Sequence, residues 1–144
     1  MSRNRNQTDT DKLNLFLIYA ECDRQTVSRY ADVLRESGCA LHFDYGSGPQ
    51  TDNYEIVANR LKNSDAVIVF LTNAALQARN VRREVNYTIN EDIPLLCVYL
   101  KECIMTYGMQ FQLGVCPSVY LWKNDDMESL LETLLATVSG KLIT

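Results

Sequence analysis

Residues 66–71 read Ala-Val-Ile-Val-Phe-Leu, an uninterrupted apolar run rich in β-branched side chains. A strand of this composition is buried on both faces, as the central strands of parallel sheets are. Other largely apolar runs, at residues 13–19, 39–43, 94–100 and 118–122, are also predicted to be strands. The chain therefore has five strand segments, and Ala66–Leu71 is expected near the centre of the sheet.

Two helices are predicted ahead of this central strand. The first follows Asp23, which can cap it, and ends at Gly38. The second covers Tyr54–Lys62 and is expected to turn four residues toward the core: Ile56 and Leu61, with Val57 and Ala58 beside them. Residues 44–53, which are dense in Gly, Pro, Asp and Asn, are predicted to form a loop.

Two further helices are predicted after the central strand. One runs without interruption over residues 73–90, with a single apolar stripe made of Ala74, Ala78, Val81, Val85 and Ile89. The other begins at Asp125 or Asp126 and places its leucines on the sheet. Residues 101–117 show no regular pattern and are expected to be irregular.

Strands that alternate with helices indicate right-handed βαβ units. The predicted fold is a flavodoxin-like α/β domain, a doubly wound sheet of five parallel strands in the order 2-1-3-4-5. Ligands of such sheets bind beyond the carboxyl ends of the strands, at the switch point between the first and third strands. This places the segments Tyr19–Asp23, Asp44–Asn53 and Thr72–Glu84 around one crevice.

The composition is that of one globular domain. The chain has 144 residues, of which 47% are hydrophobic and 22% charged. We expect a flexible N-terminal segment at residues 1–12 and a folded domain over residues 13–144. The net charge of −4 argues against a nucleic-acid partner, which would require a basic face.

The cysteines and the single histidine bear on metal binding and on compartment. Five cysteines form no CxxC pair, and His42 is the only histidine, so no metal site is predicted. The odd cysteine count indicates reduced thiols, and we expect a cytoplasmic protein. No apolar run approaches the roughly 20 residues of a membrane-spanning helix, so no membrane partner is predicted.

Three kinds of chemistry are disfavoured at the predicted crevice. The turn after the first strand lacks the glycines of a dinucleotide-binding loop. Leu71-Thr72-Asn73 offers no phospho-acceptor carboxylate, and one histidine within a strand does not suit a hydrolase triad. Chemistry by carboxylates remains, and the candidate residues at the crevice are Glu21, Asp23, Asp44 and Glu84. Glu84 lies beside the apolar stripe. Besides a role in the chemistry of the crevice, it can be interpreted as a half-exposed, ion-paired residue on the helix surface.

Several segments, in this order, resemble the Toll/interleukin-1 receptor (TIR) domain of the bacterial type. The three longest are FLIYAECDR at residues 16–24, SDAVIVFLTNAAL at residues 64–76 and NVRREVNYTI at residues 80–89. Phe43-Asp44, Ile93–Leu96 and Gln112–Gly114 complete a similarity that covers residues 13–138.

The resemblance implies an activity and a site. In enzymatic TIR domains a glutamate at the position of Glu84 is catalytic, which implies cleavage of the nicotinamide–ribose bond of NAD+. NAD+ is then the substrate, with no separate cofactor. The positions that the resemblance assigns to substrate binding are Tyr19, Ala20, Glu21, Asp44, Tyr54 and Asn80. It further implies an ADP-ribose or cyclic ADP-ribose signal in bacterial antiphage defence, and self-association through TIR–TIR contacts.

Two departures from the family pattern concern this site. Ile18 replaces a serine that often precedes the first-strand tyrosine, and Asn80 replaces a tryptophan that often precedes the glutamate by four residues. Two other functions remain open. One is a non-enzymatic TIR–TIR interaction module, and the other is an enzyme resembling nucleoside deoxyribosyltransferases.

Overall fold

A parallel sheet of five strands forms the middle layer of the protein, in the predicted order β2-β1-β3-β4-β5. The computed structural model describes residues 13–43 and 54–139. Its strands are β1 (Asn14–Ile18), β2 (Ala40–Phe43), β3 (Ala66–Leu71), β4 (Leu95–Tyr99) and β5 (Ser118–Tyr120). The predicted fold class is confirmed, although most strands are a residue or more shorter than their apolar runs.

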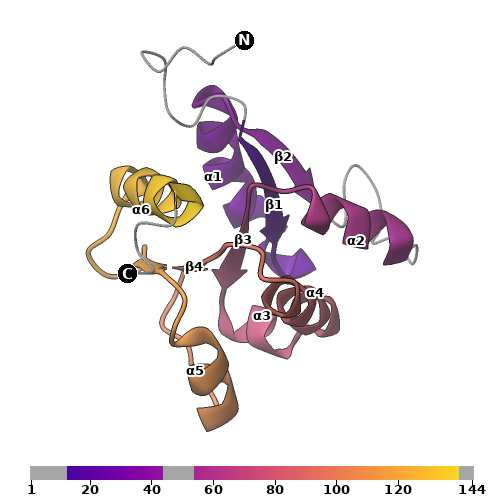
Figure 1. Ribbon diagram of the computed structural model, residues 1–144. Helices are drawn as coiled ribbons and strands as arrows, with labels where there is room; N and C mark the ends of the chain where they lie inside the picture. The colour runs from indigo at the N-terminus through magenta and orange to yellow at the C-terminus, as the bar shows by residue number, and fades with distance from the viewer. Residues whose placement is uncertain (1–12, 44–53, 140–144) are drawn as a thin grey trace.

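The position of β3 confirms what its composition predicts. It pairs with β1 on one side, where Leu15 is opposite Ala66, and with β4 on the other, where Ile68 is opposite Leu96. All six of its side chains are buried, because helices cover both faces of the sheet. The termini of β1 and β3 therefore lie side by side in the middle of the molecule (Figure 1).

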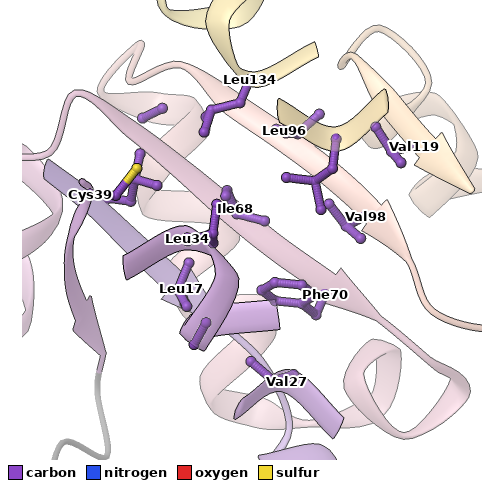
Figure 2. Packing of buried hydrophobic residues seen from close by; sticks show 14 of the residues in the cluster. Leu17, Val27, Leu34, Cys39, Ile68, Phe70, Leu96, Val98, Val119 and Leu134 are labelled. Atoms are coloured by element: carbon purple, nitrogen blue, oxygen red, sulfur yellow. The ribbon is translucent and has the colours of Figure 1, made fainter. Parts of the chain in front are cut away.

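Two helices cover one face of the sheet: α1 (Arg24–Glu36) and α6 (Met127–Ser139). Figure 2 shows Val27 and Leu34 of α1 and Leu134 of α6 against the side chains of this face. Gly38 ends α1 as predicted, with φ 99° and its amide bonded to Arg35 O. Asp126 Oδ1 accepts a hydrogen bond from Ser129 N at 3.0 Å, which confirms Asp126 at the start of α6.

The opposite face packs against α2 (Tyr54–Lys62) and α4 (Arg79–Asn90). Val57 and Leu61 of α2 are buried as predicted. Ile56 is 41% exposed, so the prediction that it faces inward is wrong. The helix is short, and its Val57–Leu61 edge alone is directed at the sheet.

The predicted helix over residues 73–90 is two helices, α3 (Asn73–Gln77) and α4. Ala78 separates them in an extended conformation, with φ −76° and ψ 130°. The Thr72 hydroxyl caps α3 by accepting a hydrogen bond from Ala75 N at 3.1 Å. The break changes the helical phase, so that Ala75 and Leu76 are buried and Ala74 is exposed, contrary to the predicted stripe.

The segment predicted to be irregular contains α5 (Tyr107–Leu113). Thr106 caps it by accepting a hydrogen bond from Met109 N at 3.2 Å. The pattern of this helix is hard to recognise because its large apolar residues face solvent. No helix in the described residues is long and apolar enough to cross a membrane.

Candidate active site

A cavity of about 300 Å³ lies between α2 and α4, and Glu84 lines it. Its other lining residues are Tyr54, Glu55, Val57, Ala58, Leu61, Arg83 and Tyr87. Glu84 is 2% exposed, with both carboxylate oxygens shielded from solvent. It is therefore not the half-exposed helix residue of the alternative interpretation. A carboxylate in this setting acts in a low-dielectric environment, where its charge interacts strongly with nearby groups.

The backbone around Glu84 is held by its own helix. The Thr88 hydroxyl donates a hydrogen bond of 2.7 Å to the Glu84 carbonyl oxygen, and Thr88 is fully buried. Val81 and Val85, on the same side of α4, are buried against the sheet. Val81 and Val85 thus anchor α4 on the sheet. Glu84 lies beside them, on the side of α4 that faces α2.

Tyr54 and Arg83 meet at the rim of the cavity. The guanidinium carbon of Arg83 lies 4.8 Å from the centroid of the Tyr54 ring, a cation–π arrangement. Tyr54 is 59% exposed, so one face of its ring remains accessible to a ligand. The structure brings Tyr54 and Glu84, both predicted site residues, to one cavity. Arg83 and Tyr87 also line it, and the sequence signal for Tyr87 was its spacing of three residues from Glu84 on one helix.

Asn80 ties α4 to the end of β1. Its side-chain amide donates a hydrogen bond of 3.5 Å to the carbonyl oxygen of Tyr19, and the residue is 7% exposed. Ala20 is buried in the same core cluster as Val81, on the α4 side of the sheet. Asn80 and Ala20 therefore lie on the Glu84 side, where Asn80 orients the main chain that leaves β1.

The Tyr19 ring belongs to the opposite face of the sheet. It packs edge-on against Phe43, with ring centroids 6.2 Å apart, in the core under α1. It lines a separate cavity of about 200 Å³ with Arg24, Ser28 and Arg35. Side chains alternate between the faces of a strand, so neighbouring residues 19 and 20 point to different sides. The structure thus does not bring the Tyr19 ring to the Glu84 cavity.

The remaining predicted residues are less directly related to Glu84. Glu21 is exposed on the short 3-10 helix η1 (Glu21–Asp23) and is not among the residues lining the α2–α4 cavity. Asp44, with its loop, lies outside the described residues. In the part of the chain that the structure describes, no three His, Cys, Asp or Glu side chains are grouped as metal ligands.

Asp23 joins the ends of β1 and β3, a role that sequence reasoning missed. Its carboxylate accepts a hydrogen bond of 2.5 Å from the Thr72 hydroxyl, and its side chain does not cap α1 as predicted. Burial raises the pKa of the nearby Cys103 thiol, and the negative charge of Asp23 raises it further. Thr72 thus connects the Asp23 turn to the start of α3, which leads into the α4 helix that carries Glu84.

Glu84 thus lies shielded at a cavity between two helices on one face of a doubly wound sheet, and the family to which the chain belongs is found by comparison. The profile of the TIR domain family matches residues 15–135. The chain belongs to the TIR domain family. The resemblance noted from the sequence is thereby confirmed. The TIR family has members that cleave NAD+, and TIR domains typically self-associate.

Solved structures show the same TIR-like fold at low sequence identity. The TIR domain of the Toll-related receptor TRR-2 from Hydra magnipapillata is 12% identical, with a TM-score of 0.65 over 92% of this chain and 100% of that one. The SEFIR domain of interleukin-17 receptor B is 19% identical, with a TM-score of 0.61 over 88% of this chain and 96% of that one.

A third match is an enzyme. The CMP N-glycosidase BcmB of Clostridium botulinum is 15% identical, with a TM-score of 0.57 over 84% of this chain and 97% of that one. At these identities the likeness extends to the fold alone. A comparison with curated proteins gives no match.

Proposed function

We propose that this TIR domain cleaves the nicotinamide–ribose bond of NAD+, as a glycohydrolase or ADP-ribosyl cyclase, with Glu84 as the catalytic residue. The observation that carries the proposal is the position of Glu84. Its carboxylate is shielded from solvent and lines a cavity whose rim holds an exposed aromatic ring and an arginine. Pockets with a few convergent polar groups in an apolar lining are the usual form of ligand sites.

The reaction requires little beyond one carboxylate. Nicotinamide leaves NAD+ as a neutral base, so the departing group needs no proton from a general acid. Positive charge develops on the ribose as an oxocarbenium ion, as in glycosidases. A carboxylate fixed beside the ribose stabilises that charge in the transition state, and removal of water strengthens the interaction. Water or an internal nucleophile then takes the place of nicotinamide.

The rim residues provide contacts for the rest of the substrate. The exposed face of the Tyr54 ring can stack on a planar group of NAD+. Arg83 carries the positive charge that the diphosphate of NAD+ would pair with, and guanidinium groups suit phosphate oxygens geometrically. In this proposal the nicotinamide riboside half would occupy the cavity of about 300 Å³, and the diphosphate would lie at the rim near Arg83.

Asn80 is proposed to act indirectly, by positioning the main chain at Tyr19 rather than by contacting the substrate. Many relatives carry a tryptophan here, whereas this chain has an amide bonded to the Tyr19 carbonyl oxygen. Asn80 therefore orients the Tyr19–Ala20 backbone, and it supplies no aromatic wall. For Tyr19, Glu21 and Asp44 the substrate-binding role remains a proposal, and a bound nucleotide would have to reach beyond the α2–α4 cavity to meet the Tyr19 ring.

The biological setting follows as part of the same proposal. We place the domain in the cytoplasm, in agreement with its five free cysteines. Its product would be ADP-ribose or a cyclic isomer, formed as a signal in bacterial antiphage defence. Self-association is proposed as a means to complete the site.

Two other functions predict different results. A non-enzymatic TIR–TIR interaction module would consume no NAD+. An N-glycosidase acting on nucleoside 5′-monophosphates, the substrate class named for BcmB, would use the same glutamate and arginine on a smaller molecule. Arg83 at the cavity favours this second candidate over the nucleoside deoxyribosyltransferase reaction, because a nucleoside carries no phosphate for the guanidinium group to bind.

One experiment separates these functions. The purified domain is incubated in parallel with NAD+ and with CMP, and every product is identified by mass. Nicotinamide and ADP-ribose species support the proposal, and free cytosine supports the second candidate. If neither substrate is consumed at high protein concentration, the interaction module remains and the catalytic assignment of Glu84 is wrong.

A further inference from the structure

Two of the five cysteines lie together beside the last two strands of the sheet. Cys97 is in the middle of β4 and is fully buried, and Cys116 comes two residues before β5 and is partly buried. The strands are parallel neighbours with Cys97 opposite Ser118, and the Cys97 amide donates a hydrogen bond of 2.9 Å to the Pro117 carbonyl oxygen. The main chain therefore fixes the segment that carries Cys116 beside Cys97.

The two thiols also interact directly. Cys116 packs against the core cluster that contains Cys97, and the two side chains share a hydrogen bond. This bond lowers the pKa of the Cys116 thiol, although burial acts in the opposite direction. It raises the pKa of the Cys97 thiol, and burial raises that pKa further. The proton of the pair thus stays on Cys97, and Cys116 more readily forms the thiolate, which is the reactive form of a cysteine.

A small molecule can reach Cys116. The residue lines a cavity of about 510 Å³, whose walls are mostly apolar and include Ile89, Ile93 and Val115. Cys97 is not among the lining residues, so a reagent that enters this cavity meets Cys116 first. The arrangement therefore consists of an accessible sulfur with a second thiol directly behind it.

The other cysteines lack this combination. Cys39 is buried in the core cluster on the opposite face of the sheet. Burial raises the pKa of the Cys103 thiol, and the charge of Asp23 raises it further. Cys22 is exposed on η1, after β1, and β3 separates β1 from the strands that hold the pair. Selective chemistry is therefore expected at Cys116.

We propose that Cys116 and Cys97 are a thiol pair that reacts with hydroperoxides and closes to an intramolecular disulfide. The Cys116 thiolate attacks one oxygen of the hydroperoxide. A sulfur–oxygen bond forms, the oxygen–oxygen bond breaks, and the departing hydroxide or alkoxide takes up a proton from solvent. Cys116 is then a sulfenic acid, which condenses with a thiol. The Cys97 sulfur attacks the Cys116 sulfur, and the hydroxyl group leaves with the Cys97 proton as water. The two thiols are oxidised and the hydroperoxide is reduced.

The pair is independent of the proposed NAD+ cleavage. Neither cysteine lines the Glu84 cavity, so a failure of the catalytic proposal leaves the thiol chemistry unaffected. Both cysteines are free thiols in the structure, which agrees with a reducing compartment. The disulfide is expected to form only when a hydroperoxide is present.

The test maps the disulfide directly. The reduced parent chain is treated with a small excess of hydrogen peroxide, the remaining thiols are alkylated, and non-reduced peptides are identified by mass spectrometry. Trypsin cleaves after Lys101, so Cys97 and Cys116 lie on separate peptides that only a disulfide can join. Further cleavage by chymotrypsin after Phe111 separates Cys116 from Cys103. A cross-link between Cys97 and Cys116 is the expected main product.

Two variants separate the steps of the reaction. Cys97→Ala, which keeps a small apolar side chain in the core, should stop at the Cys116 sulfenic acid, and dimedone should trap it. The pH profile of Cys116 alkylation should move to higher pH in this variant, because the hydrogen bond that lowers its pKa is lost. Cys116→Ser should leave Cys97 reduced. The matched control is Cys22→Ser, which removes an exposed cysteine and should form the disulfide at the parent rate.

Several results would overturn the proposal. One is a parent chain in which peroxide oxidises Cys22 or Cys103 while Cys97 and Cys116 remain free for alkylation. Another is a cross-link from Cys116 to Cys103, or one between two chains. An unchanged alkylation profile of Cys116 in a folded Cys97→Ala variant would also contradict it. The peptide map of the parent decides by itself, so the test does not depend on the stability of any variant.

Discussion

The guanidinium group of Arg83 stands 4.8 Å from the centre of the Tyr54 ring and joins α4 to α2 beside the Glu84 carboxylate. The two helices approach the site from distant parts of the sequence, and their contact defines the rim of one cavity. Arg83 is placed so that it could exchange its contact with the ring for one with a substrate phosphate. The rim is therefore a place to test substrate recognition separately from catalysis.

Replacing Glu84 with Gln should remove NAD+ cleavage and leave the fold intact. The change keeps the size of the side chain and removes only its charge, and loss of transition-state stabilisation should lower the rate by about 10²–10³. Glu55→Gln, at the exposed end of the same cavity, is the control and should retain activity. Equal loss in both variants, measured as nicotinamide release, would argue against a specific role of Glu84.

Replacing Tyr54 with Ala should raise KM more than it lowers stability. A stacking contact contributes about 0.5–1.5 kcal/mol beyond area burial, which corresponds to roughly a two- to twelvefold change. Tyr54→Phe keeps the ring and should behave like the parent. Because Tyr54 is 59% exposed, the melting temperature should change little; a large decrease with unchanged KM would assign the ring to folding.

Replacing Arg83 with Gln should weaken the use of substrates that carry phosphate. A hydrogen bond to a charged group contributes about 1.5–3 kcal/mol, so KM for NAD+ should rise at least about tenfold. KM for nicotinamide riboside, which has no phosphate, should remain the same. Arg82→Gln is the control, since Arg82 is exposed and lines a different cavity beside α5. A uniform effect on both substrates would contradict a phosphate contact.

Replacing Asp23 with Asn should make Cys103 react faster with iodoacetamide. Burial and the charge of Asp23 both raise the pKa of the Cys103 thiol, so removing the charge lowers that pKa. More thiolate is then present at a given pH, and the pH profile of alkylation moves to lower pH. Peptide mapping by mass spectrometry distinguishes Cys103 from the exposed Cys22. An unchanged profile would show that Asp23 does not act on this thiol.

The cleavage rate per molecule should rise with protein concentration if association completes the site. Residues 44–53, which lie outside the described residues, were predicted from their composition to form a loop beside the crevice, and ordering of a segment at a binding site is thermodynamically linked to association. The rate is measured over about a hundredfold dilution, and the mass of the protein is measured at each concentration. A flat rate with a monomeric mass throughout would mean that a monomer is fully active.

Much of the sheet was predictable because its signals are local. The β-branched run Ala66–Leu71 indicates a doubly buried strand wherever it occurs, and alternating helices allow few ways to connect parallel strands. Gly38 and Asp126 mark helix ends through backbone freedom and side-chain capping, which act within a few residues. The order of the family segments likewise identified Glu84 and Tyr54, which the structure places at one cavity.

Other features depend on contacts between residues that are distant in the sequence, and a local sequence pattern does not contain this information. The helix α3 begins after Thr72, whose hydroxyl both caps it and bonds to Asp23 from another turn, and it ends at the break at Ala78. Glu84 is shielded because α2 covers that shoulder of α4, and periodicity reports only which side of a helix is apolar. The outward face of α5 is held by the Gln112–Asn86 bond. The sequence by itself determined the strands, their order and the family, because short-range propensities and chain connectivity suffice for these. Only tertiary packing decided which polar residues are buried and which apolar ones are exposed, because that choice depends on the neighbours that folding brings together.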